Sequence, residues 1–224
     1  MSSRHILCRA MQSVRTIACA NQFKGRNLSN QQCQFLQHWG LNIPIGLPSL
    51  PRLVRWFSPP TGRLKLNVDG AFKRNTGNVG GGGILCNANS DLIFAFATAY
   101  SVVHSSLEVE AFALCDGLSI CCNMGISTVA VKTDSLVLVQ TLKGQSSCPW
   151  RLIYIMHEVA LMCRMLQVSI THIFREANQV ADCLAGLGCS LSTSPSLWLS
   201  WADLPTLVKG PYRLDKIGCP SIRP

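Results

Sequence analysis

Residues 64–75 read "LKLNVDGAFKRN" and place a carboxylate inside a strand pattern. Apolar residues at positions 64, 66, 68 and 72 alternate with polar or small ones, and this period of two predicts a β-strand with Asp69 on the face opposite the leucines. Aspartate is disfavoured inside strands, and burying its charge is costly unless a cation or hydrogen-bond donors meet it. Asp69 is therefore a candidate functional residue.

Length and composition indicate a folded chain. The 224 residues give room for one ordinary domain with tails or for two small domains, and 48% of them are hydrophobic. That fraction is too high for a disordered protein. No run of about 18 apolar residues without a charge occurs, so we expect no membrane-spanning helix and no membrane partner.

The net charge of +9 is spread unevenly along the chain. Residues 1–61 hold seven basic and no acidic residues, residues 62–190 hold nine of each, and residues 191–224 hold four basic and two acidic ones. The middle of the chain is therefore neutral, and the positive charge lies in its ends. A basic arm of this kind suits a polyanionic partner, although a targeting segment has the same composition.

The twelve cysteines form no Cys-x-x-Cys pair and no Cys/His quartet at zinc spacing. Most of them lie in apolar runs such as "FALCDGLSICCNMG", where they are typical of small core residues. No secretory signal is evident. We therefore expect free thiols in a reducing compartment, not a disulfide framework.

The first 62 residues are predicted to lie outside the folded domain. Residues 1–35 form a basic, flexible leader in this interpretation, and apolar residues at helical spacing within residues 1–20 resemble an organellar transit peptide. An arbitrary leader or the remnant of a longer parent protein explains them equally well. Residues 36–62 are rich in proline and predict an extended linker. We expect an intracellular protein, in the nucleus, the cytoplasm or, if the leader is a transit peptide, an organelle.

From residue 63 the pattern becomes regular. Three strands are predicted first, the second and third joined by a hairpin at Asn87–Ser90. A helix with Ser106 as its N-cap follows and ends at Gly125, and then come a strand, two helices, a strand and a last helix. The order βββαβααβα predicts an α/β domain over residues 63–190, with a mixed five-stranded sheet flanked by helices. Residues 191–224 are predicted to be a C-terminal tail.

Acidic residues are scarce, with eleven in the chain, so each position can be weighed. Glu108 and Glu110 begin the first predicted helix, and only one of them can face a given site because two residues along a helix differ by roughly 200°. Asp134 ends the strand in "VAVKTD", where ligands gather in α/β sheets. Asp182 lies in the first turn of the last helix, on the same face as Asn178.

Most of these acids also have a structural explanation. Asp134 could cap the helix that begins at Ser135, and Glu110 and Asp182 could complement helix N-termini. Asp69 has no such role, and four acids at the ends of neighbouring elements are better explained together. Close carboxylates repel unless divalent cations neutralise them, and oxygen ligands without a Cys/His set favour Mg²⁺ or Mn²⁺. Two such ions about 4 Å apart would hold the attacking water and the leaving oxygen of a phosphodiester.

The sequence resembles the ribonuclease H family, in particular the plant ribonuclease H-like domains related to retroelement reverse transcriptases. The resemblance lies in "KLNVDGAF", "GNVGGGGIL", "SSLEVEAFALCDGL", "VKTDS" and "FREANQVADCLA", in this order. It implies a ribonuclease H-like fold and cleavage of the RNA strand of RNA–DNA hybrids with two Mg²⁺, or Mn²⁺. It also selects Glu110 over Glu108. The implied catalytic and metal-binding residues are Asp69, Glu110, Asp134 and Asp182.

Further residues are candidates for contacts with nucleic acid. Selection of RNA requires contact with the 2′-hydroxyl, and Gly70, Ser106 and Ser135 offer N–H or hydroxyl groups near the acids. Turn and cap chemistry explains these three residues equally well. Arg175 stands where some relatives carry a basic residue that assists product or metal turnover, and it could instead contact a phosphate; His172 is an alternative for the turnover role.

We therefore predict a monomeric, metal-dependent nuclease for RNA–DNA hybrids. The Lys-rich protrusion with which bacterial relatives grip hybrids is missing, so substrate binding should be weak and steeply dependent on salt unless the basic arm contributes. A rival interpretation is a catalytically inactive, retroelement-derived domain that binds nucleic acid. A structural or interaction module is a third, for which the sequence shows no positive feature.

Overall fold

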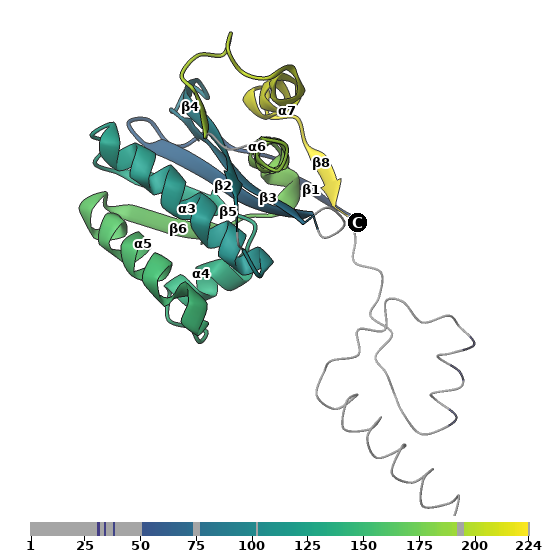
Figure 1. Cartoon of the computed structure of the whole chain (residues 1–224). Helices are drawn as coiled ribbons and strands as arrows, with labels where there is room; N and C mark the ends of the chain where they lie inside the picture. The colour runs from purple at the N-terminus through teal and green to yellow at the C-terminus, as the bar shows by residue number, and fades with distance from the viewer. Residues whose placement is uncertain are drawn as a thin grey trace, which may run out of the picture. The chain divides into compact units, whose positions relative to one another are not determined.

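A computed structural model of the chain describes residues 51–73, 77–101, 103–191 and 195–223, together with Gln31, Gln34 and His38. Apart from these three residues, the predicted leader and the first part of the predicted linker lie outside the described residues. The elements (Figure 1) are β1 Arg52–Val54, β2 Leu64–Lys73, β3 Asn78–Cys86, β4 Leu92–Tyr100, α3 Ser106–Asn123, β5 Val129–Thr133, α4 Leu136–Leu142, η2 Trp150–Leu152, α5 Ile153–Met165, β6 Val168–His172, η3 Arg175–Ala177, α6 Gln179–Gly188, β7 Ser196–Trp198, α7 Thr206–Lys216 and β8 Ser221–Arg223.

The central sheet has six strands in the order β6-β5-β2-β3-β4-β7. The pairs β2–β3, β3–β4 and β4–β7 are antiparallel, whereas β2–β5 and β5–β6 are parallel. From β2 to α6 the strands and α-helices follow the predicted order, so the α/β class with a mixed sheet is confirmed. The prediction of five strands was short by one, because β7 adds a three-residue strand at the β4 edge.

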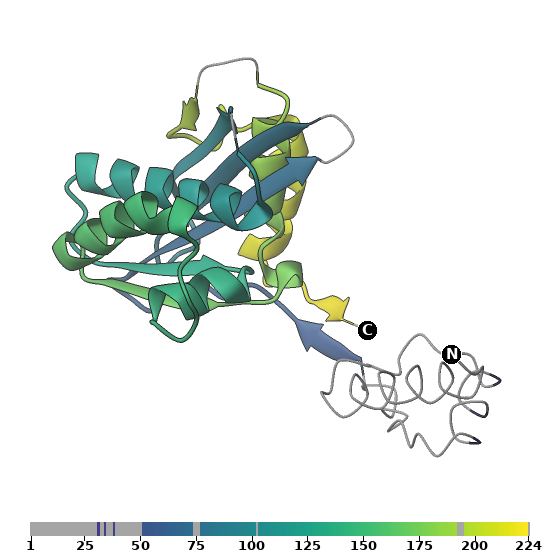
Figure 2. The ribbon, with the colours of Figure 1, turned by 60° about the horizontal axis from the view of Figure 1, so that its bottom comes forward.

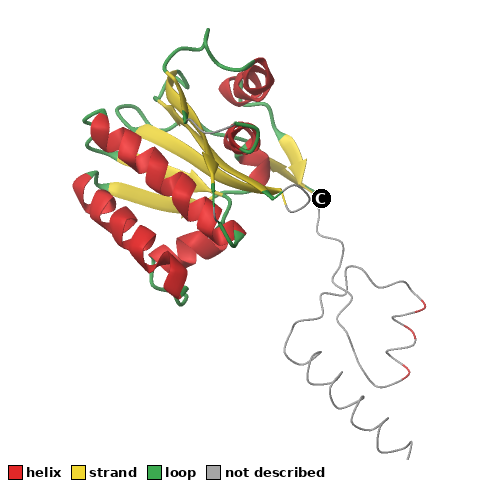
Figure 3. Ribbon diagram, in the orientation of Figure 1, coloured by secondary structure: helices red, strands yellow, loops and turns green. Residues whose placement is uncertain are grey.

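One face of the sheet is covered by α3, α4 and α5 (Figure 3). Leu66 and Val68 of β2 project to this face and pack with buried residues of the three helices, such as Leu118 of α3. The period of two that predicted β2 therefore separates its apolar side chains from Asp69, as expected. We call this side the α3–α5 face.

The opposite face is covered by α6 and α7, and we call it the α6–α7 face (Figure 2). Trp56, from the segment before β2, is buried there with Leu184 of α6 and with Val208 and Tyr212 of α7. Residues 53–223 consequently form one compact unit, which is wider than the predicted domain of residues 63–190. The predicted tail supplies a helix to the core because α7 carries apolar side chains at helical spacing.

Glycines of β3 allow α6 to lie directly on the sheet. A Cβ atom added to Gly82 would come within 2.5 Å of the backbone of α6, at Leu184 C and Ala185 N. The same addition at Gly80 would come within 2.4 Å of Gly188 C. The run "GGGG" in β3 is therefore explained by the close approach of a helix backbone.

The first helix begins with a different cap from the one predicted. Ser105, not Ser106, is the N-cap of α3, and its side chain accepts a hydrogen bond from Glu108 N at 3.2 Å. Both serines have the chemistry of a cap, so composition alone did not distinguish them. The predicted hairpin is present between β3 and β4, and Gly125 follows α3 with a positive φ of 69°.

The nine described cysteines are all free thiols, and three of them are buried. In the part of the chain that the structure describes, we find no helix with both the length and the hydrophobicity to cross a bilayer.

Candidate active site

Three of the predicted acids lie together at one end of the sheet. Oxygen atoms of Asp69, Glu110 and Asp134 all lie within 4.8 Å of one another, and we call these residues the acidic triad. The pairing of β2 with β5 ends at Asn67 and Lys132, two residues before Asp69 and Asp134. The two carboxylates therefore lie just beyond the last paired residues of neighbouring parallel strands, where both can approach α3.

Glu110 reaches the triad because α3 lies very close to β2. A Cβ atom at Gly70 would come within 2.7 Å of Glu110 N and 2.8 Å of Val109 C, so the glycine permits this approach. Glu108 lies on another side of the helix, where its Oε2 accepts a hydrogen bond from His104 N at 2.6 Å. Of the two glutamates, Glu110 is thus the one in the cluster, and Glu108 stabilises the start of α3.

Asp134 does not cap the helix that follows it. Ser135 is the N-cap of α4, and its Oγ accepts a hydrogen bond from Leu138 N at 3.4 Å. Ser135 N in turn donates to Thr133 Oγ1 at 3.1 Å. Since these bonds satisfy the turn, the carboxylate of Asp134 is available to the triad.

The electrostatics of the triad favour a bound cation. Burial, followed by the charges of Glu110, Asp134 and Asp182, raises the pKa of Asp69 far above its ordinary value. Burial and then Asp134 also raise the pKa of Glu110. Glu110 Oε2 is buried and has no hydrogen-bond partner among the described residues. A divalent cation would supply both the missing positive charge and a partner for this oxygen, so the residues fit such an ion.

Asp182 is close to the triad but is not part of it. Its Oδ1 is paired with Nη2 of Arg175 at 2.5 Å, and it does not belong to the group of carboxylates within 4.8 Å. It is nevertheless near, because its charge contributes to the raised pKa of Asp69. Asp182, then Asp69 and Asp134, also raise the pKa of Arg175. The structure therefore places the Arg175–Asp182 pair at the edge of the site, not at its centre.

The remaining predicted contact residues lie around the triad. Gly70 follows Asp69 directly, and Ser135 follows Asp134 as a helix cap. Ser106 is exposed at the first position of α3, about one turn before Glu110. Their contact with substrate stays a prediction.

Sequence analysis missed a set of polar residues behind the triad. Asn178 Nδ2 lies 3.3 Å from Asp134 Oδ1, and Asn178 Oδ1 accepts a hydrogen bond from Asn67 at 2.9 Å. Trp56 Nε1 donates to Asn67 Oδ1 at 3.0 Å. Asn67 could have been noticed as a second polar residue on the buried strand, but nothing in the spacing linked it to Trp56.

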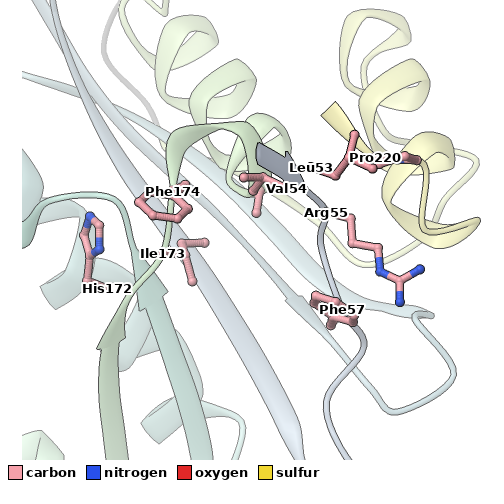
Figure 4. Close-up of a pocket in the computed structure, with 9 residues that line it drawn as sticks. Leu53, Val54, Arg55, Phe57, His172, Ile173, Phe174 and Pro220 are labelled. Atoms are coloured by element: carbon pink, nitrogen blue, oxygen red, sulfur yellow. The ribbon is translucent and has the colours of Figure 1, made fainter. Parts of the chain in front are cut away.

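A hollow of about 560 Å³ opens beside the end of β6 (Figure 4). Leu53 and Phe57 line it from β1 and the segment after it, and Ile173 lines it from the segment after β6. Ile173 N donates to Thr133 O at 2.9 Å, so the hollow adjoins the end of the strand that precedes Asp134. Its lining is mostly apolar and contains no carboxylate, so the acidic chemistry belongs to the triad.

Most of the folded part of the chain matches a known protein family. The family model described as reverse transcriptase-like matches residues 67–188, which are 122 of the 224 residues. A protein of Arabidopsis thaliana that is provisionally named a ribonuclease H protein is 29% identical over 220 residues. The match covers 92% of this chain and 34% of that protein, so the chain spans about a third of the relative's length.

Solved structures with a similar fold include three ribonucleases H. The enzyme RNase H1 from Halobacterium salinarum has a TM-score of 0.54 at 22% identity and covers 58% of this chain and 98% of its own. The N-terminal RNase H domain of a Mycobacterium tuberculosis protein has a TM-score of 0.53 at 21% identity, covering 57% and 94%. LC11-RNase H1, solved in complex with an RNA/DNA hybrid, has a TM-score of 0.53 at 19% identity, covering 57% and 97%.

At these identities the structural similarity shows the fold, and the family match rests on the sequence. The matched residues run from the middle of β2 to the end of α6 and so include all three acids of the triad. The chain therefore belongs to the reverse transcriptase-like family and has a ribonuclease H-like fold.

Proposed function

We propose that this protein is a ribonuclease H that hydrolyses the RNA strand of RNA–DNA hybrids with two divalent cations, Mg²⁺ or Mn²⁺. The acidic triad carries the proposal, because three carboxylates within 4.8 Å and a buried, unpartnered Glu110 Oε2 form a site that divalent cations would neutralise and complete. The names of the similar proteins add support, since one of them was solved with an RNA/DNA hybrid.

The proposed roles follow from position. Asp69, Glu110 and Asp134 would hold the cations, and Asp182 would join them as a ligand when Arg175 turns to a phosphate. When bound, divalent cations at such a site supply charge that activates water and stabilises the leaving oxygen of a phosphodiester.

Arg175 is well placed to exchange partners because its side chain is 72% exposed and that of Asp182 is 39% exposed. An exposed ion pair contributes little to stability, so breaking it for a phosphate costs little. The N–H and hydroxyl groups of Gly70, Ser106 and Ser135 remain our proposed contacts for the 2′-hydroxyl of RNA.

Cleavage of a labelled RNA–DNA hybrid tests the proposal. With Mg²⁺ or Mn²⁺, the wild-type chain should cut the RNA strand, and Asp134→Asn should reduce the rate by at least the roughly 10- to 100-fold that loss of a partner of a metal ligand causes. Asp203→Asn is the matched control, because it removes one negative charge from an exposed residue before α7. It should leave the rate unchanged.

Two results would count against the enzyme. If neither wild type nor Asp134→Asn cuts the hybrid with either ion, the inactive nucleic-acid-binding interpretation is preferred. Equal cleavage by both proteins would show that the triad does not carry the reaction.

A further inference from the structure

A chain of buried polar side chains connects the segment before β2 to the acidic triad. Trp56 Nε1 donates to Asn67 Oδ1 at 3.0 Å, and Asn67 Nδ2 donates to Asn178 Oδ1 at 2.9 Å. Asn178 Nδ2 then donates to Val68 O at 3.0 Å and to Asp134 Oδ1 at 3.3 Å. Trp56, Asn67 and Asn178 are 6%, 2% and 1% exposed, so water does not substitute for these bonds.

The donors and acceptors fix the direction of this chain. An indole N–H can only donate, whereas an amide side chain can present either its oxygen or its nitrogen. Trp56 therefore holds the oxygen of Asn67 toward itself and turns the nitrogen of Asn67 toward Asn178. At the other end the carbonyl of Val68 can only accept, so the nitrogen of Asn178 faces Val68 and Asp134. Both ends thus require the same orientation of the two amides.

Asn178 makes these hydrogen bonds instead of capping α6 with its side chain. It occupies the N-cap position of α6, and asparagine is among the residues that most often cap helices. Its side chain nevertheless makes no capping hydrogen bond. Ser105 and Ser135, in the same position of α3 and α4, do cap their helices. The amide of Asn178 is therefore directed toward the triad and not toward its own helix.

We propose that Trp56, Asn67 and Asn178 form a positioning relay that holds the Asp134 carboxylate in the orientation needed for a divalent cation. The inference rests on the proposed metal centre. Trp56 lies outside the family match of residues 67–188, so the relay extends the site into the flanking segment. Residues behind metal ligands contribute in this way because a held carboxylate loses less freedom when the ion binds.

Mn²⁺ binding to the full chain, measured by calorimetry without substrate, tests the relay. Asn178→Ala should weaken Mn²⁺ affinity by about 10- to 100-fold, the range for partners of metal ligands. Trp56→Phe keeps an aromatic ring but loses the donor, and it should weaken the affinity by about threefold to tenfold.

Trp198→Phe is the matched control. Trp198 packs against the same apolar cluster as Trp56, and its indole makes no hydrogen bond with any residue that the structure describes. This variant should bind Mn²⁺ as the wild type does. Thermal unfolding of all variants checks that they are folded. If Asn178→Ala does not fold, the Mn²⁺ affinity of Trp56→Phe alone tests the relay.

The relay is overturned if Trp56→Phe and Asn178→Ala, both folded, bind Mn²⁺ as tightly as wild type. It is also overturned if Trp198→Phe weakens binding as much as Trp56→Phe, or if the wild type binds no Mn²⁺. Hybrid cleavage is read separately. If the relay variants bind Mn²⁺ more weakly but the wild type cuts no hybrid, the relay is kept and the proposed function is rejected. If the wild type cuts the hybrid but the variants bind Mn²⁺ with unchanged affinity, the proposed function is kept and the relay is rejected.

Discussion

The α3–α5 face of the sheet packs apolar side chains against apolar side chains, whereas the α6–α7 face also buries polar side chains of β2. Leu66 and Val68 project to the first face. Lys65 and Asn67 alternate with them and are buried on the other side, at 6% and 2% exposure. The difference indicates that the α3–α5 face contributes mainly to stability, whereas the α6–α7 face also orients the groups around the site.

The largest effect is expected on the α3–α5 face. Leu118→Ala deletes a fully buried side chain of the apolar core and should lower the free energy of unfolding by about 2–5 kcal/mol. Val208→Ala on α7 removes fewer atoms from the other face and should cost about 1–2.5 kcal/mol. Urea unfolding of both variants measures the two values. A larger loss for Val208→Ala would reverse the assigned roles of the faces.

A smaller loss is expected where α6 lies on β3. Gly82→Ala places a methyl group against the backbone of α6 and should lower the free energy of unfolding by about 1–3 kcal/mol. Because α6 carries Asn178 and Asp182 at its start, the variant should also weaken Mn²⁺ binding. Gly186→Ala, whose added Cβ would meet nothing within 4 Å, is the control and should be neutral or stabilising. Equal behaviour of the two variants would show that α6 is not closely docked.

The triad should be a source of instability in the metal-free protein. Asp69→Asn removes a carboxyl group whose ionisation is opposed by burial and by the neighbouring acids, and it should raise the free energy of unfolding by about 1–2 kcal/mol in a chelating buffer. Added Mg²⁺ should then stabilise the wild type but not the variant. Thermal melting with and without Mg²⁺ gives both results. If Asp69→Asn lowers the melting temperature of the metal-free protein, repulsion within the triad is not the dominant force.

A pH-dependent effect is expected on the polar side of β2. Burial lowers the pKa of Lys65 to about 7, against smaller raising effects of Cys86 and Asp215. Between about pH 7 and 10.5 the unfolded chain therefore binds a proton that the folded chain lacks, and the folded state gains stability as the pH rises.

Relative to Lys65→Met, the wild type should gain at most about 1.4 kcal/mol per pH unit in this range. Urea unfolding at pH 7.5 and 9.5 tests the prediction. Lys143→Met changes an exposed lysine and should follow the wild type at both values. A constant difference between wild type and Lys65→Met would contradict the effect of burial.

Elements with strong periodicity could be predicted from the sequence. The alternation in β2 separated Leu66 and Val68 from Asp69, and the helical pattern after Ser105 gave α3. The positions of Asp69, Glu110 and Asp134 at the ends of elements were also enough to predict that these three acids lie close together. These features depend on local pattern and on the topology that the pattern implies.

Other features depend on tertiary contacts that no local pattern contains. The three-residue strand β7 is defined by its pairing with β4, and the folding of α7 onto the sheet depends on the space beside α6. The pairing of Asp182 with Arg175 is a choice of side-chain orientation. Asn178 fits a cap from its position, and only the structure shows its amide turned inward.

Anomalous diffraction from crystals grown with Mn²⁺ tests the central claim most directly. We expect a Mn²⁺ peak in contact with carboxylate oxygens of Asp69, Glu110 and Asp134, and no such peak in crystals of Asp134→Asn. Ordered carboxylates with no peak between them, or a peak bound elsewhere on the chain, would contradict the assignment of the triad as a metal centre.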